Sequence, residues 1–80
     1  MATATLEAPM LQTYVDQIGE TAGLIWHTLA DDGPTPITKL IKKVEAPRDL
    51  VMQGIGWLAR EEKIAVSEES RTRIISLIGA

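Results

Sequence analysis

The sequence predicts a small α+β domain in which three helices precede a β-hairpin. Two observations lead to this prediction. Before Glu62, apolar residues recur every three or four positions in three segments, which is the spacing of helices with one buried face. After Lys63 the pattern changes to a period of two, which is typical of β-strands. We expect the domain to span residues 10–80, after a flexible tail at residues 1–9 that has no periodicity.

The first helix is expected to begin near Met10 or Leu11 and to end at the Gly33-Pro34 pair. Gly33 suits a left-handed cap, and Pro34 cannot continue a helix because it has no backbone N–H. The apolar stripe that we expect to be buried consists of Val15, Ile18, Ala22, Ile25, Trp26 and Leu29.

Two glycines lie four residues apart on one side of this helix. In a helix interior each glycine costs about 1 kcal/mol relative to alanine. We therefore expect another element to approach the helix closely at Gly19 and Gly23.

The second segment begins with Thr35-Pro36-Ile37, which is too short for an independent strand but could add an edge strand to the hairpin. Thr38 is the predicted N-cap of a second helix over residues 39–44. A turn at residues 45–47 follows, with Pro47 near the first position of the next helix. The apolar face of this second helix consists of Ile37, Leu40, Ile41 and Val44.

The third helix is predicted to have one buried and one exposed side, with Trp57 between them. Its buried side is expected to carry Val51, Gly54, Ile55, Leu58 and Ala59. Its exposed side is expected to carry Asp49, Met52, Gln53, Gly56 and Arg60. A strand from Ile64, a turn at Ser70 and a second strand over residues 71–78 complete the chain. Two helices joined by a short turn and followed by a hairpin are typical of a winged helix-turn-helix.

Three segments carry a resemblance to a known family. They are IGETAGLIWHTLADDG (residues 18–33), ITKLIKKVEAP (residues 37–47) and VMQGIGWLAREEKI (residues 51–64). In these segments the chain resembles the small bacterial winged helix-turn-helix domains that are classed as a domain of unknown function. The resemblance implies the fold and an association with DNA binding and transcription regulation, and it carries no assigned active site or ligand.

Composition argues for a cytoplasmic binding domain and against catalysis. No apolar run is long enough to span a bilayer, and the first ten residues do not form a secretory signal. The chain has no cysteine, and its single histidine, His27, has no catalytic partner at a recognisable spacing. One histidine without cysteine also makes a metal site unexpected. We expect no catalytic residue, no metal and no cofactor.

Duplex DNA is the first predicted partner, bound with the third helix in the major groove. The candidate contacts are Arg48, Gln53, Arg60, Lys39, Lys42, Arg71 and Arg73, with Gln53 as the base reader. Asp49 beside the phosphate site and Glu68 and Glu69 at the tip of the hairpin oppose this role. The net charge is −3, with eight basic against six acidic residues from Thr35 onward, so we expect weak and salt-sensitive binding.

A protein-interaction module is the alternative, in which Met52, Gly56 and Trp57 form a small apolar patch. Self-association as a homodimer through this patch or the first helix is a variant of this hypothesis. Trp57 could instead complete the core beside the first helix, against Trp26. The sequence leaves open whether the domain binds DNA or protein and whether it is monomeric or dimeric.

Overall fold

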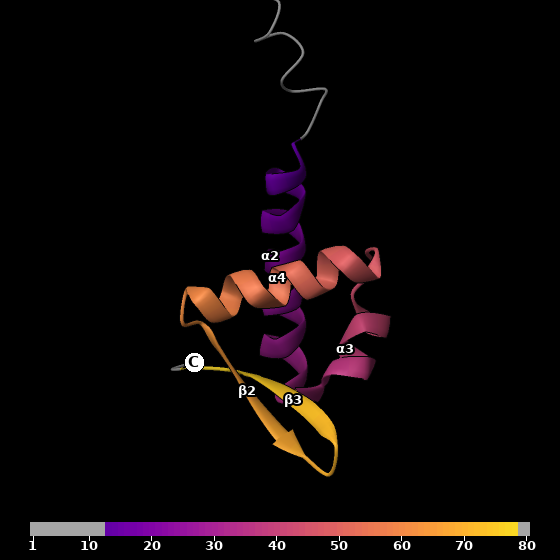
Figure 1. Cartoon of the computed structure of the whole chain (residues 1–80), viewed down its shortest axis with the longest axis vertical. Helices are drawn as coiled ribbons and strands as arrows, with labels where there is room; N and C mark the ends of the chain where they lie inside the picture. The colour runs from indigo at the N-terminus through magenta and orange to yellow at the C-terminus, as the bar shows by residue number, and fades with distance from the viewer. Residues whose placement is uncertain (1–12, 79–80) are drawn as a thin grey trace, which may run out of the picture.

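Helix α2 (Tyr14–Asp32) is the longest element, and helix α4 (Arg48–Arg60) crosses it. This arrangement comes from a computed structural model, which describes residues 13–78. Figure 1 shows the first turns of α2 extending beyond α4, while the remaining elements lie on the other side of α4. Residues 13–78 therefore form three helices and a three-stranded sheet, the predicted α+β arrangement.

Helix α2 begins at Tyr14 because the Thr13 side chain caps it: its Oγ1 accepts a hydrogen bond from the Asp16 N–H at 3.0 Å. The predicted start near residues 10–11 is therefore wrong. Those residues and the predicted tail at residues 1–9 lie outside the described part of the chain. At the other end Gly33 has a φ of +76°, and its N–H donates to the Leu29 carbonyl at 2.8 Å. Gly33 is therefore the predicted cap, with a positive φ, but its ψ of −163° differs from that of the left-handed helical conformation.

Strand β1 (Thr35–Pro36) forms the edge of an antiparallel sheet in the order β1-β3-β2. It pairs Thr35 with Ile75 in strand β3 (Thr72–Leu77), so the expected third strand is confirmed. Helix α3 (Ile37–Lys43) follows directly, two residues earlier than predicted. Thr38 is not its N-cap, because Pro36 holds the extended N-cap position without a side-chain hydrogen bond.

Strands β2 (Ile64–Glu69) and β3 form the predicted hairpin, in which Val66 pairs with Ile75. The loop consists of Ser70 and Arg71, and both have positive φ values, of 51° and 72°. Arg71 therefore belongs to the turn. The prediction that the second strand begins at Arg71 is wrong. Positive φ at both loop positions matches the right-handed twist of the flanking strands.

The core lies where α2, α3, α4 and the sheet meet. Its buried side chains are Ala22, Ile25, Leu29, Leu40, Val44, Val51, Ile55, Leu58, Ile64 and Ile75. Ala59, which was expected to be buried, is exposed. Val15 and Trp26 were also predicted to be buried, but they are 62% and 39% exposed. Val15 lies in the first turn of α2, in the part that extends beyond α4.

The close approach between α2 and α4 occurs at Gly54. A Cβ atom at this position would lie 2.9 Å from Ile25 Cδ1 and 3.2 Å from the Ala22 nitrogen. At Gly19 and Gly23 a Cβ atom would meet nothing within 4 Å. The prediction that a neighbouring element packs against those two glycines is therefore wrong, because α4 crosses α2 on a different side of the helix.

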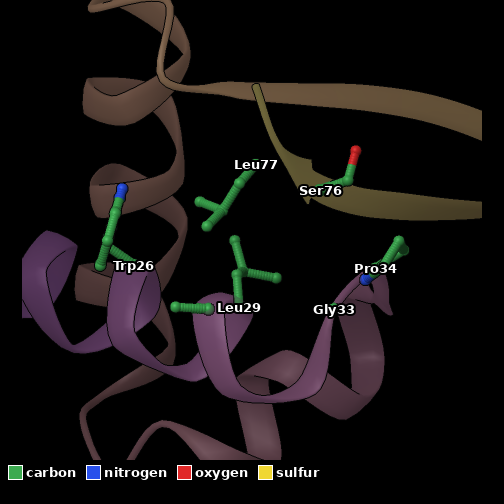
Figure 2. A pocket seen from close by; sticks show the side chains of 7 residues that line it. Trp26, Leu29, Gly33, Pro34, Ser76 and Leu77 are labelled. Atoms are coloured by element: carbon green, nitrogen blue, oxygen red, sulfur yellow. The ribbon is translucent and has the colours of Figure 1, made fainter. Parts of the chain in front are cut away.

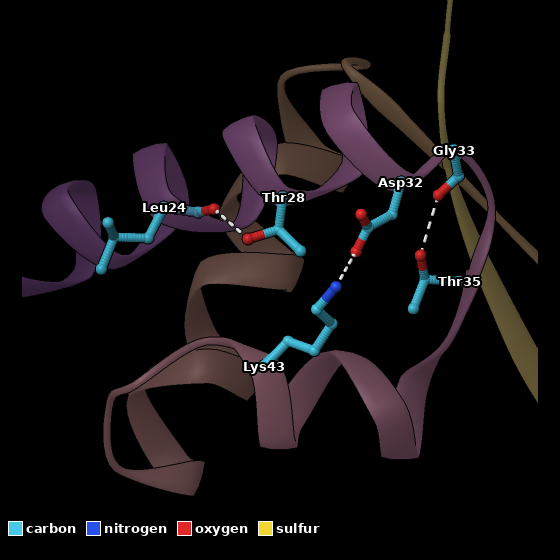
Figure 3. Close-up of polar contacts among 6 residues, drawn as sticks. All are labelled: Leu24, Thr28, Asp32, Gly33, Thr35 and Lys43. Atoms are coloured by element: carbon cyan, nitrogen blue, oxygen red, sulfur yellow. Dashed lines mark hydrogen bonds and ion pairs between the residues drawn. The ribbon is translucent and has the colours of Figure 1, made fainter.

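Polar contacts hold the end of α2 to the segment that follows it. Asp32 forms an ion pair with Lys43 at the end of α3, and the Thr35 hydroxyl donates to the Gly33 carbonyl at 2.8 Å (Figure 3). The first contact joins the end of α3 to the end of α2, and because it is partly exposed it contributes little to stability. The second orients β1 as it leaves the helix cap.

Candidate interaction surfaces

The outward side of α4 is exposed as the sequence predicted. Asp49, Met52, Gln53, Gly56 and Arg60 are all exposed. Met52 and Trp57 are five residues apart, which places them about 140° apart around a helix with 3.6 residues per turn. The predicted patch of Met52, Gly56 and Trp57 therefore does not lie on one side of α4.

Gln53, the predicted base reader, takes part in a hydrogen-bonded chain with α2. Its Nε2 donates to the Tyr14 hydroxyl at 2.7 Å, and that hydroxyl donates to Asp49 Oδ2 at 3.1 Å. Asp49 Oδ1 also accepts the Leu50 N–H at 2.9 Å. One amide proton of Gln53 is thus engaged within the protein. Sequence reasoning missed Tyr14 in this site because the contact joins residues 39 positions apart.

The wing, which we define as β2, β3 and their loop, carries acidic residues toward its tip. Glu68 pairs with Arg73 across the hairpin, and its Oε2 lies 3.9 Å from Arg73 Nε. Both side chains are well exposed, so the pair contributes little to stability. Arg73 is therefore balanced by a neighbouring carboxylate, and Glu69 adds a further negative charge.

The remaining predicted DNA contacts are dispersed over α3, α4 and the hairpin loop. Within residues 13–78 no ion pair engages Lys39, Lys42, Arg48, Arg60 or Arg71. Lys43 is paired with Asp32. Glu45 and Asp49 lie among these cations along the chain. The structure brings α3, α4 and the wing together as a winged helix-turn-helix does, but it interleaves cations with carboxylates.

A groove with a mixed apolar and polar lining lies between α2 and α4. We call it the tryptophan groove; its volume is about 430 Å³. Trp26 and Trp57 both line it and are 39% and 47% exposed. The hypothesis that Trp57 completes the core is therefore wrong. The lining residues are Gly19, Ala22, Gly23, Trp26, Trp57, Leu58, Glu61 and Lys63.

A second hollow of about 320 Å³ lies between the end of α2 and β3, and Trp26 borders it as well. Figure 2 shows Leu29 and Leu77 directed toward one another across it, with Pro34 and Ser76 at its other side. Trp26 thus separates two adjacent hollows, which makes the surface around it both apolar and uneven.

His27 lies beside Trp26, with the two rings edge to face and their centroids 5.5 Å apart. Among residues 13–78, no three His, Cys, Asp or Glu side chains are grouped so that they could hold a metal ion. No helix in this part of the chain is both long and apolar enough to cross a membrane.

Comparison with known proteins agrees with this architecture. A family model described as a winged helix-turn-helix domain (DUF2582) matches residues 11–77. The uncharacterized protein MJ1608 of Methanocaldococcus jannaschii is 40% identical over an alignment of 63 residues, which covers 76% of this chain and 90% of that protein. Because that relative is archaeal, similarity to this chain is not confined to bacteria. The chain belongs to the winged helix-turn-helix family DUF2582.

Proposed function

We propose that this domain is a protein-interaction module, which binds its partner in the tryptophan groove and has no catalytic role. The observation that carries the proposal is the pair of half-exposed tryptophans that line one groove. Tryptophan is enriched among the residues that dominate binding energy at protein interfaces. An 80-residue chain with two tryptophans, one tyrosine and no phenylalanine would bury its aromatic residues if packing alone determined their position.

The charge distribution supports protein over DNA as the partner. The net charge is −3, and the wing carries Glu68 and Glu69 near its tip. Binding to duplex DNA depends on neutralising several phosphates at once, and interleaved carboxylates weaken this electrostatic attraction. The predicted base reader, Gln53, is held by Tyr14.

Site-specific photo-crosslinking in cells tests the proposal. A benzoylphenylalanine placed at Trp57 is expected to give a discrete protein adduct, since this position lines the groove. Placed at Val66, which is equally exposed but lies on β2 outside the groove, it is expected to give none. Gly23→Leu, which fills the groove, should remove the adduct from position 57. Equal adducts from both positions, or none from position 57, would contradict the proposal.

Duplex-DNA binding with a role in transcription regulation is the second candidate, and the conformation of Arg71 favours it. Arg71 has a φ of 72°, which glycine adopts without strain but which costs free energy for a residue with a side chain. The wing tip therefore carries a long basic side chain at a position where glycine would be more stable. Titration with mixed-sequence duplex DNA tests this candidate. Shifts of the Arg48, Gln53 and Arg71 amide signals that reverse as salt increases would support it, and unchanged signals at low salt would exclude it.

A further inference from the structure

We infer that the tryptophan groove accepts an amphipathic α-helix of a partner protein whose apolar side is flanked by lysine or arginine. The inference rests on the proposed function and specifies the partner's chemistry. Three features of the groove lead to it: its glycine floor, its helical walls and the charges along its edge.

The glycine floor explains how a helix could fit. Gly19 and Gly23 are one helical turn apart, and both line the groove together with Ala22. None of these three residues has a large side chain, so the surface of α2 is low at this point. Neither glycine is required by packing within the chain, since a Cβ atom at either position would meet nothing within 4 Å. Two interior glycines cost the helix about 2 kcal/mol relative to alanine. Close approach by a partner explains why this cost is retained.

The walls favour a helix over an extended peptide. Residues of α2 and α4 provide six of the eight lining residues, and the other two, Glu61 and Lys63, lie between α4 and β2. An extended peptide gains affinity by hydrogen bonding to the exposed edge of a strand, and no strand residue lines this groove. Gly19 and Trp26 are seven residues apart, so the groove extends for about 10 Å along α2. This length matches two turns of a partner helix that carries apolar residues at i, i+3 or i+4, and i+7.

The charges identify the flank of that partner. Asp16 and Glu20 each precede a groove glycine by three residues, so they are its neighbours on the surface of α2. Glu61, the C-cap residue of α4, lines the groove, and Lys63 is the single basic residue in the lining. Helix α2 contains no lysine or arginine. A basic flank complements this edge, whereas a second copy of the chain would bring the same acidic helix against it.

Two designed peptides without tryptophan test the inference on the full chain. Both carry a leucine stripe; one is flanked by lysines and the other by glutamates. Trp26 and Trp57 are the two tryptophans of the chain, so their fluorescence reports burial of the groove. The lysine peptide is expected to shift the emission to shorter wavelength and to bind at least about tenfold more tightly than the glutamate peptide, because like charges oppose binding of the latter.

A matched pair of glycine variants locates the binding. Gly23→Leu should weaken binding of the lysine peptide by about tenfold or more, because the new side chain fills the groove. Gly56→Leu should leave it unchanged, since Gly56 is an exposed glycine of α4 outside the groove lining, with open space around its Cβ position. Equal weakening by both variants would show non-specific attraction between charges and would overturn the inference.

The remaining outcomes separate the inference from the proposed function. If both peptides bind equally while position 57 still crosslinks to a protein, the basic flank is wrong and the groove remains a binding site. If the chain is dimeric in solution and Gly23→Leu dissociates it, a second copy occupies the groove and the inference fails. If neither peptide binds and position 57 gives no adduct, both the inference and the proposed function fail.

Discussion

At the scale of single residues, Gly54 in α4 differs from Gly19 and Gly23 in α2. Gly54 is required by packing, because its missing Cβ makes room for Ile25 and for the backbone at Ala22. Gly19 and Gly23 face open space. A glycine inside a helix is therefore required by packing at position 54, whereas at positions 19 and 23 it leaves the helix surface open.

This difference gives opposite signs for one substitution. Gly54→Ala is expected to destabilise the domain by about 1–3 kcal/mol, since the added methyl group overpacks the contact between α2 and α4. Gly23→Ala is expected to stabilise it by up to about 1 kcal/mol, because alanine is the better helix former and meets no neighbour. Urea unfolding of the two variants measures both effects. The same sign for the two substitutions would contradict the packing described here.

Tyr14 connects the start of α2 to the outward side of α4 through its hydroxyl group. Tyr14→Phe is expected to reduce stability by about 0.5–1 kcal/mol, because the two hydrogen bonds it removes are exposed. The side-chain amide signals of Gln53 should shift in the same variant, while those of Gln17 should not. A Gln53 side chain that is insensitive to this substitution would show that the contact does not form in solution.

At the scale of elements, the periodicity of the sequence predicts what depends on local order. It places the three helices, the hairpin and the short edge strand. It identifies four of the five buried residues of α4, but it misses Leu50 and wrongly includes Ala59. It misses what depends on where two elements cross. The exposure of Trp26 and Trp57 and the close approach at Gly54 follow from the position at which α4 crosses α2, which no spacing within either helix records.

The hairpin loop gives a prediction for one element. Ser70 and Arg71 both have positive φ values, which cost a residue with a side chain about 1 kcal/mol or more, whereas asparagine followed by glycine suits such a loop. Ser70→Asn combined with Arg71→Gly should therefore raise stability by about 1 kcal/mol. Thermal unfolding of the double variant checks this, and a lower melting temperature would show that the loop has another conformation.

At the scale of the whole molecule, the arrangement of helices is that of a winged helix-turn-helix, while its exposed chemistry is mixed. Helix α4 and the wing combine cations that form no ion pair within residues 13–78 with the carboxylates of Asp49, Glu68 and Glu69. The two exposed tryptophans meet instead at the tryptophan groove between α2 and α4. The same fold can present either surface, so the function depends on side chains and not on the architecture.

Salt dependence gives a prediction for the molecule as a whole. If the full chain binds duplex DNA at low ionic strength, the affinity should fall steeply as salt increases, with a slope that corresponds to no more than about five neutralised phosphates. Filter binding or fluorescence anisotropy over a series of salt concentrations measures the slope. Tight binding that persists at physiological salt would contradict the charge distribution described here.

The central claim is that a partner protein covers the tryptophan groove, and oxidative footprinting of the chain in living cells tests it most directly. Relative to the purified protein, Trp26 and Trp57 should be protected from oxidation in cells, while Met52 on the other side of α4 should remain reactive. Reactive tryptophans together with a protected Met52 would contradict the claim, because the partner would then cover the outward side of α4 instead.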